Sequence, residues 1–260
     1  MRAADRNLRE VLVSAPTLPT VRARALFAPL DAGGRAETVT RRLIDAIGLG
    51  LLLDGERLPT ESVLAGQLGV STGTLRDGLA ALRTMGLVET RRGRGGGSFV
   101  RVPREHDRTR LELRLRHRSL HELRDIGDHR AAIAGMAARL AAERALEGEV
   151  ATLREHLERL RAARTLTDRR RADARIHVEI AATAQSPRLT REEMALWSAV
   201  GDLVWLPVGE VQAVAVIAEH GPLIDAIERR DPDRARALAE DHVDAETERL
   251  LRRRLELGEL

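Results

Sequence analysis

Residues 58–100 read LPTESVLAGQLGVSTGTLRDGLAALRTMGLVETRRGRGGGSFV, and this stretch decides the fold of the first part of the chain. Residues 61–68 carry apolar side chains at helical spacing, which predicts a short helix. A turn follows, with Gly69 as the expected helix stop and Ser71 as the expected N-cap of a second helix over about 72–85. That second helix has leucines at i, i+4 and i+7, so one of its faces is buried. The order of these elements predicts a helix-turn-helix.

A basic wing is predicted directly after these helices, formed by two short strands at about 87–91 and 98–102. The tip between them, RGRGGG at 92–97, combines two arginines with a Gly-rich backbone. Such a tip can lie against DNA and place guanidinium groups in the narrow minor groove. In a helix-turn-helix, the N-terminal end of the second helix normally reaches base edges in the major groove. Helix-turn-helix patterns also occur in adaptor domains, but the combination with a basic wing favours docking on duplex DNA.

The composition narrows the class of protein further. The chain has 43 basic residues, all of them Arg, and 40 acidic residues, which gives a net charge of +3. Because this net charge is small, any affinity for DNA must come from basic residues placed close together on one surface. The chain has no Cys, which excludes disulfides and thiolate metal sites and suits a reducing cytoplasm. Aromatic residues make up 2%, which argues against single-strand binding by base stacking. Neither a signal peptide nor a stretch of the roughly 20 apolar residues that span a bilayer is evident, so we expect a cytoplasmic protein with no membrane partner.

Four segments are predicted along the chain. Residues 1–35 form an irregular N-terminal arm, and residues 36–102 form the winged helix-turn-helix domain, with a first helix at 37–53. Residues 103–112 form a linker to a helical domain at 113–260, whose helical periods break into six or so antiparallel helices. The expected fold class is therefore mostly α: an N-terminal winged helix-turn-helix plus a C-terminal all-α antiparallel helical bundle.

One Asp and three His stand out in the helical domain. Asp173 and His177 are spaced i, i+4, so both project from one face of the same helix. His220 lies in a strongly apolar helix, and His242 lies between apolar neighbours on the last helix. Three imidazoles and one carboxylate suit Zn²⁺, Ni²⁺, Mn²⁺ or Fe²⁺ where they converge; hydrogen-bonded core or interface histidines are the alternative. Four other histidines lie in Arg- and Glu-rich settings that predict a solvated surface: His106, His117, His121 and His156.

The same residues resemble the GntR family of bacterial transcription regulators. In the first half the resemblance is carried by LPTE at 58–61, GVS at 69–71, LR at 75–76, GLV at 86–88 and SFV at 98–100. The second half resembles the FadR-like FCD branch of that family. The segments that carry this resemblance are Asp-x-x-x-His at 173–177, EHGPLIDAIERRD at 219–231 and EDHVDAE at 240–246.

The resemblance implies that Asp173, His177, His220 and His242 hold a divalent metal ion. It also implies a ligand-responsive repressor or activator that works as a homodimer on a short palindromic operator in double-stranded DNA. Small carboxylates and sugar acids are the effectors that it implies, and Arg130 matches the position of an arginine that could clamp a carboxylate in the metal cavity. A divalent ion held by one Asp and three neutral His keeps a charge of about +1, which attracts a carboxylate oxygen.

The motif and the resemblance together assign a set of residues to the DNA surface: Ser62, Ser71, Thr72, Thr74, Arg76, Arg92, Arg94 and Gly95. Ser62 and Thr72 depart from the family pattern, because Arg is common at both positions. Gly78 stands where the family usually has Ala, at a cost in helix propensity of about 1 kcal/mol. We therefore expect the family's mode of docking, with an altered operator or weaker binding.

These residues favour a DNA-binding regulator that is not an enzyme, and three other functions stay open. A metal-dependent enzyme with an appended DNA-binding module would need an open metal position for water, but no further carboxylate or Tyr is placed as an obvious general base. A metal sensor would respond to the ion itself, without an organic effector. A structural metal site would need no effector at all.

Overall fold

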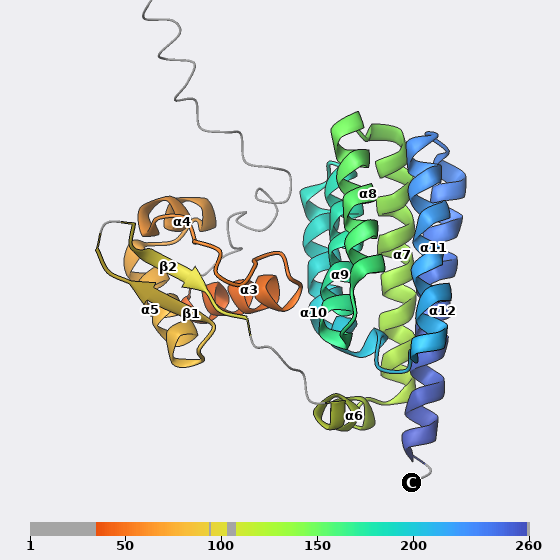
Figure 1. The fold of residues 1–260 in the computed structure, drawn as a ribbon, viewed down its shortest axis with the longest axis horizontal. Helices are drawn as coiled ribbons and strands as arrows, with labels where there is room; N and C mark the ends of the chain where they lie inside the picture. The colour runs from red at the N-terminus through yellow and green to blue at the C-terminus, as the bar shows by residue number, and fades with distance from the viewer. Residues whose placement is uncertain (1–34, 94, 103–107, 259–260) are drawn as a thin grey trace, which may run out of the picture.

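The computed structural model describes residues 35–93, 95–102 and 108–258, which form a winged part and a helical part (Figure 1). The winged part holds α3 (Ala36–Gly48), α4 (Glu61–Leu68), α5 (Thr72–Thr84), β1 (Val88–Arg91) and β2 (Gly97–Val100). The helical part holds α6 (Arg108–Arg116), α7 (Leu120–Arg144), α8 (Glu147–Ala162), α9 (Leu166–Thr183), α10 (Pro187–Val204), α11 (Glu210–Glu228) and α12 (Pro232–Gly258). The predicted fold class is confirmed. Within the described ranges, no helix is long and apolar enough to cross a membrane.

Local signals in the sequence set the helix-turn-helix. α4 ends at Gly69, whose φ of 67° is left-handed, a conformation that glycine adopts without steric penalty. α5 begins after Ser71, whose side-chain oxygen accepts a hydrogen bond from the Thr74 backbone N–H at 3.0 Å. The predicted helix stop and N-cap are therefore confirmed, and α5 packs against α3 and α4 through its buried leucines.

Gly78 lies where α3 packs on α5. A Cβ atom at this position would lie 2.9 Å from Val39 Cγ1 and 3.2 Å from the Ala36 carbonyl oxygen. The missing side chain therefore lets α3 approach α5 closely, which offsets the lower helix propensity of glycine. The wing follows, with β1 and β2 paired antiparallel so that Val88 lies opposite Val100.

The connection between the two parts is shorter than the sequence suggests. α6 begins at Arg108, so the second half of the predicted linker at 103–112 is helical, and residues 103–107 lie outside the described ranges. With α6 included, the described helical part has seven helices where about six were predicted. The predicted arm at 1–35 also lies outside the described ranges, apart from its last residue.

α7 and α12 are the two longest helices, and they lie side by side along the bundle (Figure 1). Glycines on α7 allow this packing. A Cβ at Gly127 would lie 2.5 Å from Thr247 Cγ2, and a Cβ at Gly135 would lie 2.5 Å from a carboxylate oxygen of Glu240. The close contact turns one face of α12, which includes His242 and Glu246, into the interior of the bundle.

The two parts also touch each other beside the bundle. Arg175 on α9 donates a hydrogen bond from Nε to the backbone carbonyl oxygen of Gly50 at 2.6 Å, just after α3. Gly50 has a φ of 66°, and a Cβ there would lie 2.9 Å from Arg171 Cβ on the same helix. α9 is therefore in direct contact with the winged part.

Candidate metal centre and DNA-facing surface

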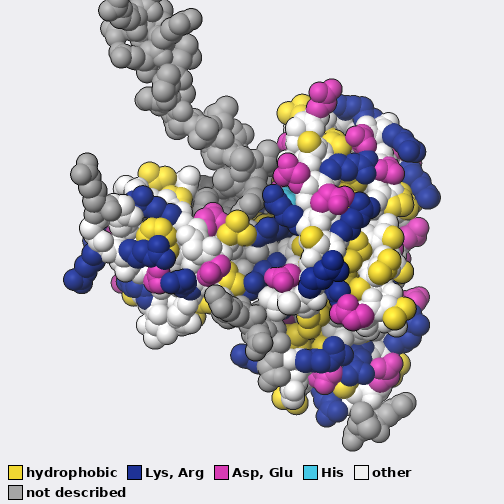
Figure 2. Space-filling model, in the orientation of Figure 1, with side chains coloured by type: hydrophobic (Ala, Val, Ile, Leu, Met, Phe, Trp, Pro, Cys, Tyr) yellow, Lys and Arg dark blue, Asp and Glu magenta, His cyan; other side chains and the backbone are white. Residues whose placement is uncertain are grey.

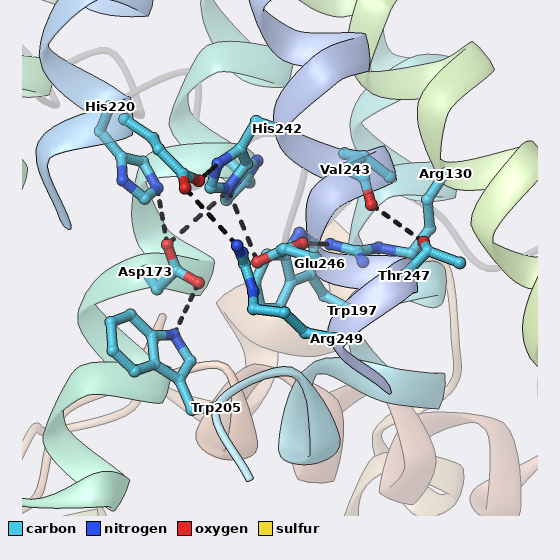
Figure 3. A network of polar contacts seen from close by, with 12 residues as sticks. Arg130, Asp173, Trp197, Trp205, His220, His242, Val243, Glu246, Thr247 and Arg249 are labelled. Atoms are coloured by element: carbon cyan, nitrogen blue, oxygen red, sulfur yellow. Dashed lines mark hydrogen bonds and ion pairs between the residues drawn. The ribbon is translucent and has the colours of Figure 1, made fainter. Parts of the chain in front are cut away.

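Asp173, His177, His220 and His242 come from three helices and converge in the bundle core. Figure 3 shows Asp173, His220 and His242 around this centre. One ligand atom from each residue can be chosen so that all four atoms lie within 4.8 Å of one another. All four side chains are buried, and Asp173 is fully buried. The i, i+4 spacing on α9 accounts for the first two residues, and the packing of α11 and α12 against the bundle brings in the other two.

The atoms that face the centre of this cluster have no hydrogen-bond partners. Asp173 Oδ1 and the Nε2 atoms of the three histidines are buried and unpartnered among the described residues. His220 Nε2 lies 2.8 Å from Asp173 Oδ1 but without the geometry of a hydrogen bond. Burying polar atoms without partners costs about 1–3 kcal/mol each, so native cores rarely leave several together. A cation at the centre would satisfy all four.

The outer atoms of two of these side chains, Asp173 and His242, are held in place. Trp205 donates a hydrogen bond from Nε1 to Asp173 Oδ2 at 2.8 Å. On the far side, His242 Nδ1 lies 2.7 Å from Glu219 Oε2, which is hydrogen-bond distance. Partners of this kind orient metal ligands and select the tautomer that leaves Nε2 free. Arg249 lies beside this arrangement, with Nη1 3.5 Å from Glu219 Oε1.

Burial and mutual attraction also set the charges. Burial lowers the pKa of His177 well below its usual value, which keeps its imidazole neutral. Burial by itself would raise the pKa of Asp173, but its close contact with His220 outweighs the effect of burial and lowers that pKa. Against the opposing effect of burial, Asp173 in turn raises the pKa of His220. The lowered pKa keeps Asp173 in its carboxylate form, which is the form that binds a metal.

Arg130, the predicted effector residue, already has a partner inside the protein. It donates a hydrogen bond from Nη2 to Glu246 Oε2 at 2.7 Å, and both side chains are about 2% exposed. Its guanidinium carbon also lies 4.9 Å from the centre of the Trp197 ring. Trp197 in turn packs against the His177 ring, at 4.9 Å between ring centroids. Arg130 therefore lies beside the cluster, as an ion-paired residue.

Two buried carboxylates beside the cluster were missed by sequence reasoning. Glu246 is one turn after His242 on α12, a spacing that could have indicated a shared face. Glu193 on α10 accepts a hydrogen bond from Trp197 Nε1 at 2.9 Å, and burial raises its pKa to about 7. Sequence reasoning placed no further carboxylate as an obvious general base, and these two carboxylates stand beside the cluster. His156 was also misplaced, because it is buried rather than solvated.

The predicted DNA-facing residues gather on the winged part. Ser62, Ser71, Thr72 and Arg76 are exposed on α4, the turn and the start of α5, and Thr74 is half-buried. Arg92 and Gly95 are exposed at the wing tip, while Arg94 lies outside the described residues. Arg76 Nε donates to Glu61 Oε2 at 2.6 Å in an exposed ion pair. Arginine side chains are spread over the visible face of both parts (Figure 2).

Comparisons with known proteins agree with this architecture. Residues 35–97 match the model of the bacterial regulatory proteins of the gntR family, and residues 125–245 match the FCD domain. The chain is 38% identical over 243 residues to the putative HTH-type transcriptional regulator RmpR of Mycobacterium gastri. The aligned region covers 92% of this chain and 89% of that relative. This chain belongs to the GntR family. It is a DNA-binding transcriptional regulator with an FCD domain, and not an enzyme.

Two further relatives extend the comparison. The Glc operon transcriptional activator of Escherichia coli is 29% identical over 219 residues, covering 80% of this chain and 84% of the activator. The solved structure of E. coli McbR/YncC covers 84% of this chain and 97% of that chain, with a TM-score of 0.52 and 20% sequence identity. The structural likeness supports the same fold for this GntR regulator.

Proposed function

We propose that this GntR regulator holds a divalent metal ion between Asp173, His177, His220 and His242, and that the ion is part of its switch. The observation that supports this most strongly is the set of four buried, inward-facing atoms without hydrogen-bond partners. The outer atoms of Asp173 and His242 are held by Trp205 and Glu219. One Asp and three His suit Zn²⁺, Ni²⁺, Mn²⁺ or Fe²⁺. When bound, the ion supplies a positive centre that can accept oxygen ligands.

On DNA, we propose that the protein reads a palindromic operator as a homodimer. Residues 36–102 form the DNA-binding domain, and residues 113–260 carry metal binding and dimerisation. In each copy the start of α5 enters the major groove, with Thr72 and Arg76 near base edges. Ser62, Ser71 and Thr74 approach the backbone, and the wing, with Arg92, Arg94 and Gly95, approaches the minor groove.

We further propose that a small carboxylate or sugar acid acts as effector beside the ion and Arg130. A direct contact supports coupling between this site and the DNA-binding domain: α9 carries Asp173 and His177 and also Arg175, which binds the Gly50 carbonyl. A shift of α9 would therefore move the segment that follows α3. A coupling free energy of about 1–3 kcal/mol is enough for a useful switch.

The experiment that tests this proposal measures metal content and DNA affinity on the same protein. We expect the full chain to carry close to one divalent ion per chain by elemental analysis, and His220→Ala to lose most of it, since removing one ligand of four breaks the site. His156→Ala is the matched control, because His156 is a buried histidine whose nearest acidic partner, Glu179, lies 3.9 Å away, outside the cluster. Full metal content in His220→Ala would overturn the ligand assignment.

Fluorescence anisotropy with the intergenic DNA upstream of the regulator's own gene then distinguishes the metal ion from an organic effector as the signal that changes DNA affinity. Specific binding should weaken steeply with salt, as expected for Arg contacts to phosphates. If affinity follows the metal concentration with no organic ligand, the ion is the signal. If affinity changes only when a carboxylate is added to metal-loaded protein, the effector is the signal. Unchanged affinity with metal removed and carboxylates added would leave the ion a structural role.

A further inference from the structure

Glu246 is the only one of the buried carboxylates around the cluster, among the described residues, that joins a predicted ligand to Arg130. It lies on α12 one turn after His242, and its Oε1 is 3.6 Å from His242 Nε2, the atom that faces the centre of the cluster. Its Oε2 accepts the hydrogen bond from Arg130 Nη2 at 2.7 Å. In Figure 3 Glu246 stands between the cluster and the Arg130 side chain. One carboxylate therefore spans the gap between the metal ligands and the guanidinium.

Glu246 and Arg130 take up the positions that an effector carboxylate and its clamp would occupy. An arginine beside a metal ion can hold an external carboxylate through charge-assisted hydrogen bonds. Here Arg130 already donates to a carboxylate of the same chain, within a buried pair. Arg130 Nε remains buried without a partner, so the hydrogen bond through Nη2 does not use the full donor set of the guanidinium.

The balance of buried charge also favours a cation next to Glu246. Asp173 and Glu246 bring two carboxylates into the core, while Arg130 brings one guanidinium, and all three side chains are at most about 2% exposed. Buried carboxylates are stable only beside positive partners, and a cation between the imidazoles would be such a partner in addition to Arg130. A divalent ion between the imidazoles would lie next to both carboxylates.

We propose that Glu246 is an internal carboxylate ligand of the ion, a role that rests on the proposed metal site. It completes the coordination shell in the resting regulator and occupies the place that an external carboxylate would share between the ion and Arg130. An external anion therefore binds only by displacing Glu246. The regulator thus carries its own competitor against any carboxylate signal.

The test uses the full-length chain loaded with Co²⁺, whose visible absorption spectrum reports the number and type of ligands, and acetate as the probe. We expect the wild-type spectrum to respond weakly to acetate. Glu246→Ala should start from an altered spectrum and respond to acetate with an affinity higher by about tenfold or more, because the internal competitor is gone. Glu248→Ala is the matched control, an exposed carboxylate on the same helix, and it should behave as wild type.

A second measurement covers the case in which the Ala variant folds poorly. Glu246→Gln keeps the shape of the side chain but replaces a carboxylate by a weaker neutral ligand, so the cobalt spectrum should still change. Acetate should also raise the melting temperature of Glu246→Ala, and this rescue should vanish in the Arg130→Met/Glu246→Ala double variant.

The outcomes separate the two proposals. If the wild type binds no Co²⁺ and carries no other divalent ion, the metal site itself is wrong. If the wild type binds Co²⁺ but the Ala and Gln variants share its spectrum and its acetate response, the metal site stands and the role of Glu246 is overturned.

Discussion

The candidate metal centre and the predicted DNA-facing surface are both clusters of charged and polar side chains, but they are built in opposite ways. In the bundle core, Asp173 and the three histidines are buried, and their atoms that face the centre of the cluster have no hydrogen-bond partners. On the winged part, Arg76 is more than half exposed and pairs with Glu61. Exposed ion pairs contribute only about 0–1 kcal/mol, whereas a broken buried pair leaves a costly charge. The proposed metal site would therefore be preorganised for a small ion, while the proposed DNA surface would exchange its exposed partners for phosphates.

The largest effect that tests this contrast concerns the buried pair of Arg130 and Glu246. Arg130→Met leaves a carboxylate uncompensated in the core, and we expect a loss of about 3–5 kcal/mol in the free energy of unfolding in the presence of a chelator. The measurement is urea denaturation. Arg139→Met, on the same helix as Arg130, is the control. It breaks a partly exposed pair with Asp233 of α12 and should cost about 1 kcal/mol or less. Equal losses in the two variants would contradict the contrast.

The next effect concerns the DNA surface and should leave folding unchanged. Arg76→Ala removes a guanidinium from the start of α5. If Arg76 reads a base, we expect the free energy of binding to the operator to weaken by about 1–3 kcal/mol. If Arg76 binds a phosphate, we expect affinity to fall equally for all DNA sequences and to depend less steeply on salt concentration. Arg83→Ala, an exposed arginine near the end of the same helix, is the control. Glu61→Gln should not weaken binding, because it only releases Arg76. A loss of thermal stability in Arg76→Ala without a loss of DNA affinity would count against this assignment.

The smallest effect is a pH dependence that arises from Glu193. Burial raises its pKa in the folded chain to about 7, above the usual 4.5. Between these values the folded state keeps a proton that the unfolded state has lost, so this group makes the free energy of unfolding fall as the pH rises from about 4.5 to about 7.

Denaturation at several pH values checks this prediction. The slope from one such group is at most about 1.4 kcal/mol per pH unit. Glu193→Gln should remove it, while Glu192→Gln, an exposed neighbour, should retain it. If the free energy of unfolding changes with pH in the same way in the wild type and in Glu193→Gln, the pKa of the Glu193 carboxyl is not raised.

How much of the structure could be predicted from the sequence depends on how far apart in the chain the interacting residues lie. The stop at Gly69 and the cap at Ser71 act over three or four residues, so they were visible in the sequence and are confirmed. The four candidate ligands were found by local spacing on α9 and by resemblance. The solvated setting expected for His156 was wrong, because its Arg- and Glu-rich neighbours lie on the other faces of α8 while its own face packs into the core.

By itself, the sequence determined the winged helix-turn-helix, the all-helical second half and the residue types able to hold a metal ion. Turn chemistry and helical period are local properties, and they are written in neighbouring residues. Only the tertiary structure decided that Arg130 is paired with Glu246, which is 116 positions away in the chain. It also decided that Glu193 is buried beside Trp197, and that α9 touches the winged part at Gly50. These contacts arise from close packing between helices, where small residues such as Gly127 and Gly135 set the approach, and helix period does not encode them.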